Sequence, residues 1–225
     1  MHDLHDHDPS RGGMTSSQGG MSSRRGVHRL LHGLWFPVVH RALAKQLMLH
    51  PGETVVDVGC GTGELARRLA ASGAQVIGVD PDERSIAIAR AGSSASRIAF
   101  HLASAESLPL PDGTADAVVS SVSAHHWTDR ERGFAEIARV LRPRGRVVLA
   151  EMTPPGGLRR ALRGHRAHRE APGAGEWLKL LEGAGLTNAR VAGVGWRRAL
   201  ALFVRAEAPT TSRELGTGVA PASSS

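Results

Sequence analysis

The sequence predicts one α/β domain in which a mostly parallel sheet is covered by helices on both faces. Short apolar runs alternate with amphipathic helical patterns through most of the chain, which is the pattern of strand–helix–strand units. The length of 225 residues is enough for one such domain with a sizeable core. With 41% hydrophobic and 22% charged residues, the composition is that of a globular protein rather than a disordered or membrane-spanning one.

The elements follow one another from residue 54 onward. Buried strands are predicted at residues 54–58, 75–79, 97–102, 116–122 and 146–151, and two further strand-like runs at about 187–194 and 197–206 close the domain. Helices are predicted from about residue 63, around 86–91, over about 134–141 and around 177–184. The third of these helices is expected to stop before Pro143.

The two ends of the chain differ in composition from its middle. Residues 1–25 and 207–225 lack apolar periodicity, so both are expected to be disordered tails around a domain at 26–206. No apolar run approaches the roughly 20 residues of a spanning helix, and the first 20 residues contain no apolar core of a secretory signal. Cys60 is the one cysteine, which excludes a disulfide framework and a cysteine-ligated zinc site. These features predict a cytoplasmic protein.

Charge and aromatic content bear on the partner. Lys and Arg outnumber Asp and Glu, 28 to 21, for a formal net charge of +7, which permits an anionic partner of any class and selects none. Four Trp, four Phe and no Tyr leave few platforms for stacking bases. A small-molecule or lipid-like partner is therefore favoured over nucleic acid, and the oligomeric state is left open.

The most informative motif, VVDVGCGTG at 55–63, joins the first predicted strand to the first helix. Gly59, Gly61 and Gly63 predict a turn of bare backbone beside a helix N-terminus, where free N–H groups can bind a carboxylate or phosphate. Asp57 precedes the turn, and Asp80 ends the second predicted strand, where a carboxylate can accept both hydroxyls of a ribose. The glycine spacing differs from the G-x-G-x-x-G of dinucleotide-binding proteins, so a nucleotide-dependent oxidoreductase is the weaker reading.

Four segments occur in the order and spacing of a known family: VVDVGCGTGELARRLA, VIGVDPDERSIAIAR, ASAESLPLPDGTADAVVSSVSAHHW and FAEIARVLRPRGRVVLAE. They resemble the class I S-adenosylmethionine-dependent methyltransferases, particularly the type 11 branch, which includes the C-methyltransferases of ubiquinone and menaquinone biosynthesis. The resemblance covers about residues 50–206. It implies a Rossmann-like fold with a seven-stranded, mostly parallel sheet and an antiparallel strand near the end, and S-adenosyl-L-methionine as the cofactor.

The resemblance also implies how the cofactor is bound. The glycine turn would cradle the methionine end, Asp57 would help to hold its ammonium group, and Asp80 would take the ribose diol. Pro81 would pack beside adenine, and the backbone N–H of Ala105 would read the edge of that ring. At the preceding position, where the family usually has Asp, this chain has Ser104, a neutral and therefore weaker acceptor for the adenine amino group.

The loop after the fourth predicted strand is expected to face the transferred methyl group, because ligands of such sheets lie outside the carboxyl ends of the strands. His125 and His126 are its candidate general bases, since the pKa of histidine suits removal of a proton from an attacking group. Either one could instead only brace the loop. Trp127 would line the acceptor pocket or pack the loop.

Two other segments could contact the acceptor. Arg160 and Arg163 belong to an arginine-rich stretch at 157–170, which predicts a solvated surface or contact with an anionic acceptor or a membrane surface. Trp35 and Phe36, ahead of the core, would close the pocket. No metal site is predicted, although the histidine- and aspartate-rich start of the chain could bind a metal if it is translated and ordered.

These features together predict methyl transfer from S-adenosylmethionine to a small-molecule or lipid-like acceptor, with S-adenosylhomocysteine as the second product. The alternatives are a catalytically idle S-adenosylmethionine-binding regulatory protein and a nucleotide-dependent oxidoreductase. The identity of the acceptor and the atom that receives the methyl group are not predicted.

Overall fold

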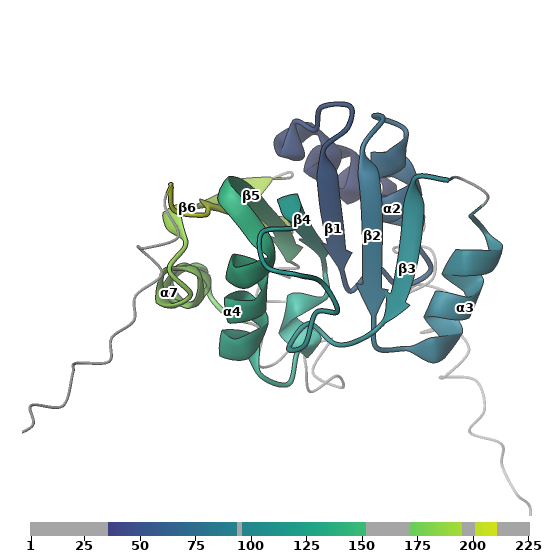
Figure 1. Cartoon of the computed structure of the whole chain (residues 1–225). Helices are drawn as coiled ribbons and strands as arrows, with labels where there is room; N and C mark the ends of the chain where they lie inside the picture. Colours follow the sequence, from purple (N-terminus) through teal and green to yellow (C-terminus); the bar gives the residue numbers. More distant parts are fainter. Residues whose placement is uncertain (1–35, 94–95, 152–171, 195–200, 211–225) are drawn as a thin grey trace, which may run out of the picture. The chain divides into compact units, whose positions relative to one another are not determined.

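The computed structural model describes residues 36–93, 96–151, 172–194 and 201–210. The chain divides into two compact units, residues 1–37 and 38–225, and the first contributes only residues 36 and 37 to the described part. The fold described here is therefore that of the second unit. Its centre is a seven-stranded sheet with the strand order β3-β2-β1-β4-β5-β7-β6 (Figure 1).

The sheet is mostly parallel. Strands β1 to β5 run parallel to their neighbours, whereas β7 runs antiparallel to both β5 and β6. The seven strands are β1 Thr54–Val58, β2 Gln75–Asp80, β3 Ile98–Leu102, β4 Ala115–Ser121, β5 Leu141–Glu151, β6 Thr187–Val194 and β7 Ala201–Glu207. The predicted fold class, including the antiparallel strand near the end, is confirmed.

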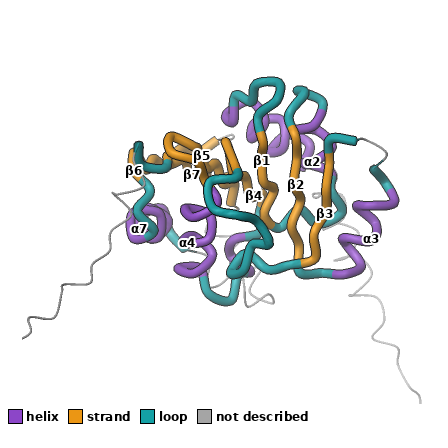
Figure 2. Tube along the Cα trace, viewed as in Figure 1, coloured by secondary structure: helices purple, strands orange, loops and turns teal. Residues whose placement is uncertain are grey.

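Helices cover both faces of the sheet. Helices α2 (Glu64–Ala70) and α3 (Glu83–Ala91) connect β1 to β2 and β2 to β3, whereas α4 (Arg130–Val140) connects β4 to β5. These connections proceed in opposite directions across the sheet, and right-handed crossovers of opposite direction place their helices on opposite faces. Helix α7 (Ala174–Gly183) packs beside α4 (Figure 2).

The alternation of side chains along β1 separates the core from the functional side. Val56 and Val58 belong to the core beneath α4 and α7, where the rings of Phe134 and Trp177 meet edge to face with centroids 6.1 Å apart. Because successive strand residues point to opposite faces, Asp57 points to the face that carries α2. A carboxylate thus lies between the valines of a buried strand.

The folded part continues past residue 206, where the sequence placed the start of a tail. Strand β7 ends at Glu207, and Ala208 is buried and donates its backbone N–H to the carbonyl oxygen of Gly145 at 2.7 Å. The backbone N–H of Arg144 donates to the carbonyl oxygen of Pro209 at 3.3 Å. The described fold therefore extends at least three residues past the predicted boundary at 206. The predicted start at residue 26, residues 1–25 and residues 211–225 lie outside the described residues.

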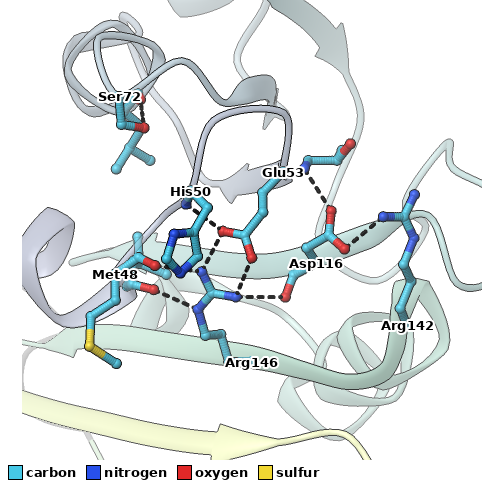
Figure 3. A network of polar contacts seen from close by, with 10 residues as sticks. Met48, His50, Glu53, Ser72, Asp116, Arg142 and Arg146 are labelled. Carbon is cyan, nitrogen blue, oxygen red and sulfur yellow. Dashed lines mark hydrogen bonds and ion pairs between the residues drawn. The ribbon is translucent and has the colours of Figure 1, made fainter.

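An ion-pair network holds together the amino-terminal ends of the central strands (Figure 3). The Arg146 guanidinium donates to both carboxylate oxygens of Glu53, at 2.7 and 3.0 Å, and to backbone carbonyl oxygens at 47–48, where the helix before β1 ends. Asp116 accepts from the first backbone N–H of β1 at 2.8 Å and from Arg142 at 2.6 Å. The glycine turn lies at the opposite end of β1, and Asp80 and η1 likewise follow the carboxyl ends of β2 and β4.

Candidate functional site

The glycine turn after β1 is fastened to the end of β2. The backbone N–H groups of Gly59 and Cys60 both donate to the carbonyl oxygen of Val79, at 2.7 and 3.1 Å. Gly59, Gly61 and Gly63 have φ angles of +77°, +51° and +79°, a region that residues with a Cβ atom rarely adopt. The chain therefore needs glycine at these positions in order to make this turn.

Two of the glycines differ in what they face. A Cβ atom on Gly59 would lie 1.8 Å from the hydroxyl oxygen of Ser123, so the turn packs directly against the loop that follows β4. A Cβ atom on Gly61 would meet nothing within 4 Å. Gly61 thus leaves bare backbone beside open space, which is the arrangement that lets a ligand approach the main chain closely.

Asp57 is a buried carboxylate that forms no hydrogen bond to the part of the chain that the structure describes. Its exposed fraction is 1%, and neither carboxylate oxygen has a hydrogen-bond partner within the described residues. Burial, together with the negative charge of Asp80, raises the pKa of Asp57 to about 7, against a smaller lowering effect of the nearby Ala66 backbone N–H, which is not placed for a full hydrogen bond. A cation or hydrogen-bond donor placed beside this carboxylate would remove most of the free-energy cost of burying its charge.

Asp80 supports the same turn from the end of β2. One carboxylate oxygen accepts the backbone N–H of Gly61 at 2.8 Å, and the other accepts that of Asp82 at 2.9 Å. Each oxygen keeps a further lone pair that can accept a hydroxyl of a ligand. The backbone N–H of Ala103 donates to the carbonyl oxygen of Asp80 at 3.2 Å, which brings the loop after β3 beside the glycine turn.

The residues expected beside adenine follow the carboxyl ends of β2 and β3. Pro81 is exposed directly after Asp80, Ser104 is half-buried, and Ala105 is 5% exposed and belongs to the core. The structure thus gathers the residues of the predicted cofactor set along neighbouring strands β1, β2 and β3.

The loop after β4 turns sharply before the two histidines. Val122 has a φ of +55°, an unusual conformation for a β-branched residue, and its N–H donates to the carbonyl oxygen of Ala150 at 2.7 Å. A short 3₁₀ helix, η1 Ala124–His126, follows. His125 is 4% exposed and His126 is exposed, with their ring centroids 4.0 Å apart. The two candidate bases therefore occupy different environments.

Glu151 is a neighbour of the candidate bases that the sequence did not single out. It ends β5, is 2% exposed, and its Oε2 atom lies 2.7 Å from Nδ1 of His125. Its Oε1 atom accepts the backbone N–H of Ala124 at 2.9 Å. Glu151 could have been predicted in the same way as Asp80, because each is a carboxylate at the carboxyl end of a buried strand.

Of the remaining predicted residues, Trp127 and Phe36 are among the described residues and three others are not. Trp127 donates its indole N–H to the hydroxyl of Ser123 at 3.2 Å, and its ring lies against Gly133 and 5.5 Å from the ring of Phe134, so it packs the loop onto α4. Phe36, which belongs to the first unit, is half-buried and is the first described residue of a helix over residues 36–47. Trp35, Arg160 and Arg163 lie outside the described residues.

No group of three or more His, Cys, Asp or Glu side chains within the described residues is arranged to hold a metal ion. Cys60 is buried, and burial raises the pKa of its thiol, which is the setting of a packing residue rather than a nucleophile. Among the helices of the described ranges, none is both long and apolar enough to cross a bilayer.

A sheet of this strand order, with a glycine turn after β1 and a carboxylate at the end of β2, defines the class I S-adenosylmethionine-dependent methyltransferase fold. A crystal structure of an S-adenosylmethionine-dependent methyltransferase from Aquifex aeolicus superposes with a TM-score of 0.63, covering 75% of this chain and 88% of that one at 22% identity. That similarity shows the fold.

Sequence comparison narrows the class to a family. Residues 56–149 match the family model described as a methyltransferase domain, of type 11. The ubiquinone/menaquinone biosynthesis C-methyltransferase UbiE of Geobacter sulfurreducens is 36% identical over 122 residues, which are 51% of this chain and 48% of that protein. The 27-O-demethylrifamycin SV methyltransferase of Amycolatopsis mediterranei is 38% identical over 126 residues, 52% of this chain and 46% of that protein.

The matched region thus spans about half the length of these curated relatives. The chain contains a methyltransferase domain of type 11 at residues 56–149, and its fold is that of the class I S-adenosylmethionine-dependent methyltransferases. The predicted family is confirmed.

Proposed function

We propose that this protein binds S-adenosylmethionine at the carboxyl ends of β1, β2 and β3 and transfers its methyl group to a small-molecule acceptor. The observation that carries the proposal is Asp57, whose two carboxylate oxygens are buried beside the glycine turn without a partner within the described residues. Such a carboxylate is costly unless a cation compensates it. S-adenosylmethionine carries two positive groups, an ammonium and a sulfonium.

The other residues of the site fit the rest of the cofactor. Asp80 has lone pairs left for the ribose hydroxyls after it has accepted two backbone N–H groups. Gly61 offers bare backbone toward open space. Ala105 and Ser104, beside the end of β2, are the residues proposed to contact adenine.

When bound, S-adenosylmethionine supplies a methyl group on a positively charged sulfur, which is a good leaving group. The contribution of the chain is to hold an acceptor in line with that methyl group and, where the acceptor carries a proton, to remove it. The loop that follows β4 carries the groups for this task, His125 and His126, and it touches the glycine turn at Gly59.

The acceptor is proposed to be a small or lipid-like molecule. The names of the relatives support a small-molecule acceptor, since one is a C-methyltransferase of quinone biosynthesis and another methylates 27-O-demethylrifamycin SV. Contact of Arg160 and Arg163 with an anionic acceptor or a membrane surface stays a prediction.

Titration calorimetry of the full chain with S-adenosylmethionine and S-adenosylhomocysteine tests the binding step, and we expect both to bind. Transfer is tested with methyl-labelled S-adenosylmethionine, a cell extract and a panel of phenols, hydroquinones and enols, with identification of the labelled product. Binding without transfer would support the idle regulatory protein. Binding of NAD(P)H in place of S-adenosylmethionine would overturn the proposal in favour of an oxidoreductase.

A further inference from the structure

We propose that Glu151 is a positioning residue that holds His125 with its proton on Nδ1, so that His125, rather than His126, accepts the proton of the acceptor at Nε2. This inference rests on the proposed methyl transfer and specifies its acceptor as a molecule whose attacking atom carries an acidic proton, such as a phenol, a hydroquinone or an enol.

The first argument is the geometry of the pair. Glu151 Oε2 lies 2.7 Å from His125 Nδ1, and the side chains of His125 and Glu151 are 2% and 3% exposed. A carboxylate at this distance accepts a hydrogen bond, so in the neutral ring Nδ1 carries the proton and Nε2 carries the lone pair. The pairing therefore selects which nitrogen can act as the base.

The second argument is that both partners are fixed. The other oxygen of Glu151 accepts the backbone N–H of Ala124 at 2.9 Å, so the carboxylate is tied to η1 as well as to the imidazole. The Arg130 guanidinium donates to the carbonyl oxygens of Ala124 and His125, at 3.3 and 3.2 Å. The histidine thus has little freedom to turn its ring or to shift its backbone.

The third argument is location. Glu151 ends β5 and η1 follows β4, and these adjacent parallel strands end on the same edge of the sheet as β1, which leads into the glycine turn. Ser123, two residues before His125, packs against Gly59 of that turn. The pair is therefore built into the wall beside the proposed cofactor site rather than placed elsewhere on the protein.

The neighbouring histidine is in a different setting. His126 is exposed, whereas the buried His125 has a carboxylate at hydrogen-bonding distance. A buried imidazolium needs a counter-charge, and Glu151 supplies one at the moment when His125 takes up a proton. The structure thus prepares His125 for a change of charge.

The proposed step balances as follows. The bond between the attacking oxygen or carbon of the acceptor and its hydrogen breaks, and the proton goes to Nε2 of His125. The electron pair of the acceptor forms the new bond to the methyl carbon. The carbon–sulfur bond breaks, and its electron pair stays on sulfur as S-adenosylhomocysteine leaves. The imidazolium paired with Glu151 then returns the proton to water.

The positioning role has a readout that needs no acceptor. Nitrogen-15 NMR of the full chain with S-adenosylhomocysteine is expected to show His125 protonated at Nδ1 and unprotonated at Nε2, with the signal of a strongly hydrogen-bonded Nδ1 proton. In Glu151→Gln this proton signal and the tautomer preference are expected to be lost. A His125 that carries its proton on Nε2, or that is unchanged in Glu151→Gln, would overturn the proposal.

The catalytic consequence is measured with the acceptor identified in the transfer assay. Glu151→Gln is expected to lower kcat by about 10²–10⁴-fold and to shift the part of the pH profile in which kcat rises with pH. The affinity for S-adenosylmethionine is expected to stay unchanged. Glu136→Gln, which alters a carboxylate bound to Arg139 and to the N–H of Leu108, is the matched control and is expected to keep wild-type kcat.

A double-variant cycle separates this role from a merely structural one. If Glu151 acts through His125, Glu151→Gln costs nothing further in a His125→Asn background, whereas two independent effects would multiply. His125→Asn is expected to lose far more activity than His126→Asn. Additive losses, or equal losses for the two histidines, would refute the assignment, whereas a wild-type protein that transfers no methyl group would instead refute the proposed function.

Discussion

Asp57 and Asp80 place two carboxylates beside one glycine turn, and the two differ in their hydrogen bonding. Asp80 has a backbone N–H donor for each oxygen, whereas Asp57, which is 1% exposed, has none within the described residues. The charge of Asp80 adds to the effect of burial in raising the pKa of Asp57. At and above neutral pH the protein without cofactor therefore carries an unfavourable charge at the place where the cofactor's positive end is proposed to bind.

The first prediction concerns the pH dependence of stability. The pKa of Asp57 is about 7 in the folded protein against an ordinary value of 3.8, so between these values the folded state holds a proton that the unfolded state has lost. The contribution of Asp57 to the free energy of unfolding is therefore fully present below pH 3.8 and falls as pH rises toward 7. We expect the free energy of unfolding of Asp57→Asn, measured in urea, to rise relative to that of wild type by up to about 1.4 kcal/mol for each pH unit across this window. Parallel curves for the two proteins would contradict the prediction.

The second prediction concerns Asp80. Loss of the charged contact that we propose between Asp80 and the ribose should weaken binding of S-adenosylmethionine by roughly 1.5–3 kcal/mol in Asp80→Ala, as measured by calorimetry. Asp80→Asn keeps one acceptor oxygen for a backbone N–H of the turn, so its melting temperature is expected to fall less while its affinity falls comparably. An unchanged affinity in both variants would refute the assignment of Asp80 to the ribose.

The third prediction compares two glycines of the turn. Gly59→Ala places a Cβ atom 1.8 Å from the Ser123 hydroxyl and 2.4 Å from its Cβ, and is expected to cost about 3 kcal/mol or more of folding free energy. Gly61→Ala meets no atom within 4 Å and should cost only its backbone strain, roughly 1–2 kcal/mol. Adding Ser123→Gly to Gly59→Ala removes both clashing atoms and is expected to restore much of the loss. Equal melting temperatures for Gly59→Ala with and without this second change would show that the clash is not the cause.

The fourth prediction concerns the Arg146 network. The hydrogen bonds from Arg146 lower the pKa of Glu53, so this carboxylate stabilises the fold above its ordinary pKa of 4.5, and that contribution is lost as pH falls through the lowered value. Glu53→Gln is expected to cost about 1–2 kcal/mol at pH 7 and less in acid, by denaturant unfolding. Asp112→Asn, which alters an 80% exposed partner of Arg139, is the control and should change stability by less than about 0.5 kcal/mol.

The fifth prediction concerns the end of the fold. A chain that ends at residue 206 lacks Glu207, which lies opposite Arg146 in the sheet. It also lacks the backbone hydrogen bonds made by Ala208 and Pro209. It is expected to melt at a lower temperature than wild type, whereas a chain that ends at residue 210 should match wild type by circular dichroism. Identical melting of all three chains would show that residues 207–209 contribute nothing.

The accuracy of the sequence predictions follows from how local each feature is. The strands, the glycine turn and Asp80 were recognisable because their signals lie within a few neighbouring residues. The pairing of His125 with Glu151 joins residues 26 positions apart and depends on β4 and β5 lying side by side, which no local pattern reports. Ala208 was assigned to a tail because its neighbours are polar or small, yet the start of β5 holds it through Gly145.

The Arg146 network and the glycine turn lie at opposite ends of the central strands, so the residues that hold the strands together are distinct from those proposed to bind the cofactor. We expect substitutions in the loops that are proposed to face the acceptor to leave intact the contacts at the other end, which hold β1, β4 and β5 together. A scaffold divided in this way tolerates experiments with new acceptors. For directed evolution, libraries confined to the carboxyl-end loops should retain a high fraction of folded members, and Glu53, Asp116 and Arg146 are the positions to keep constant.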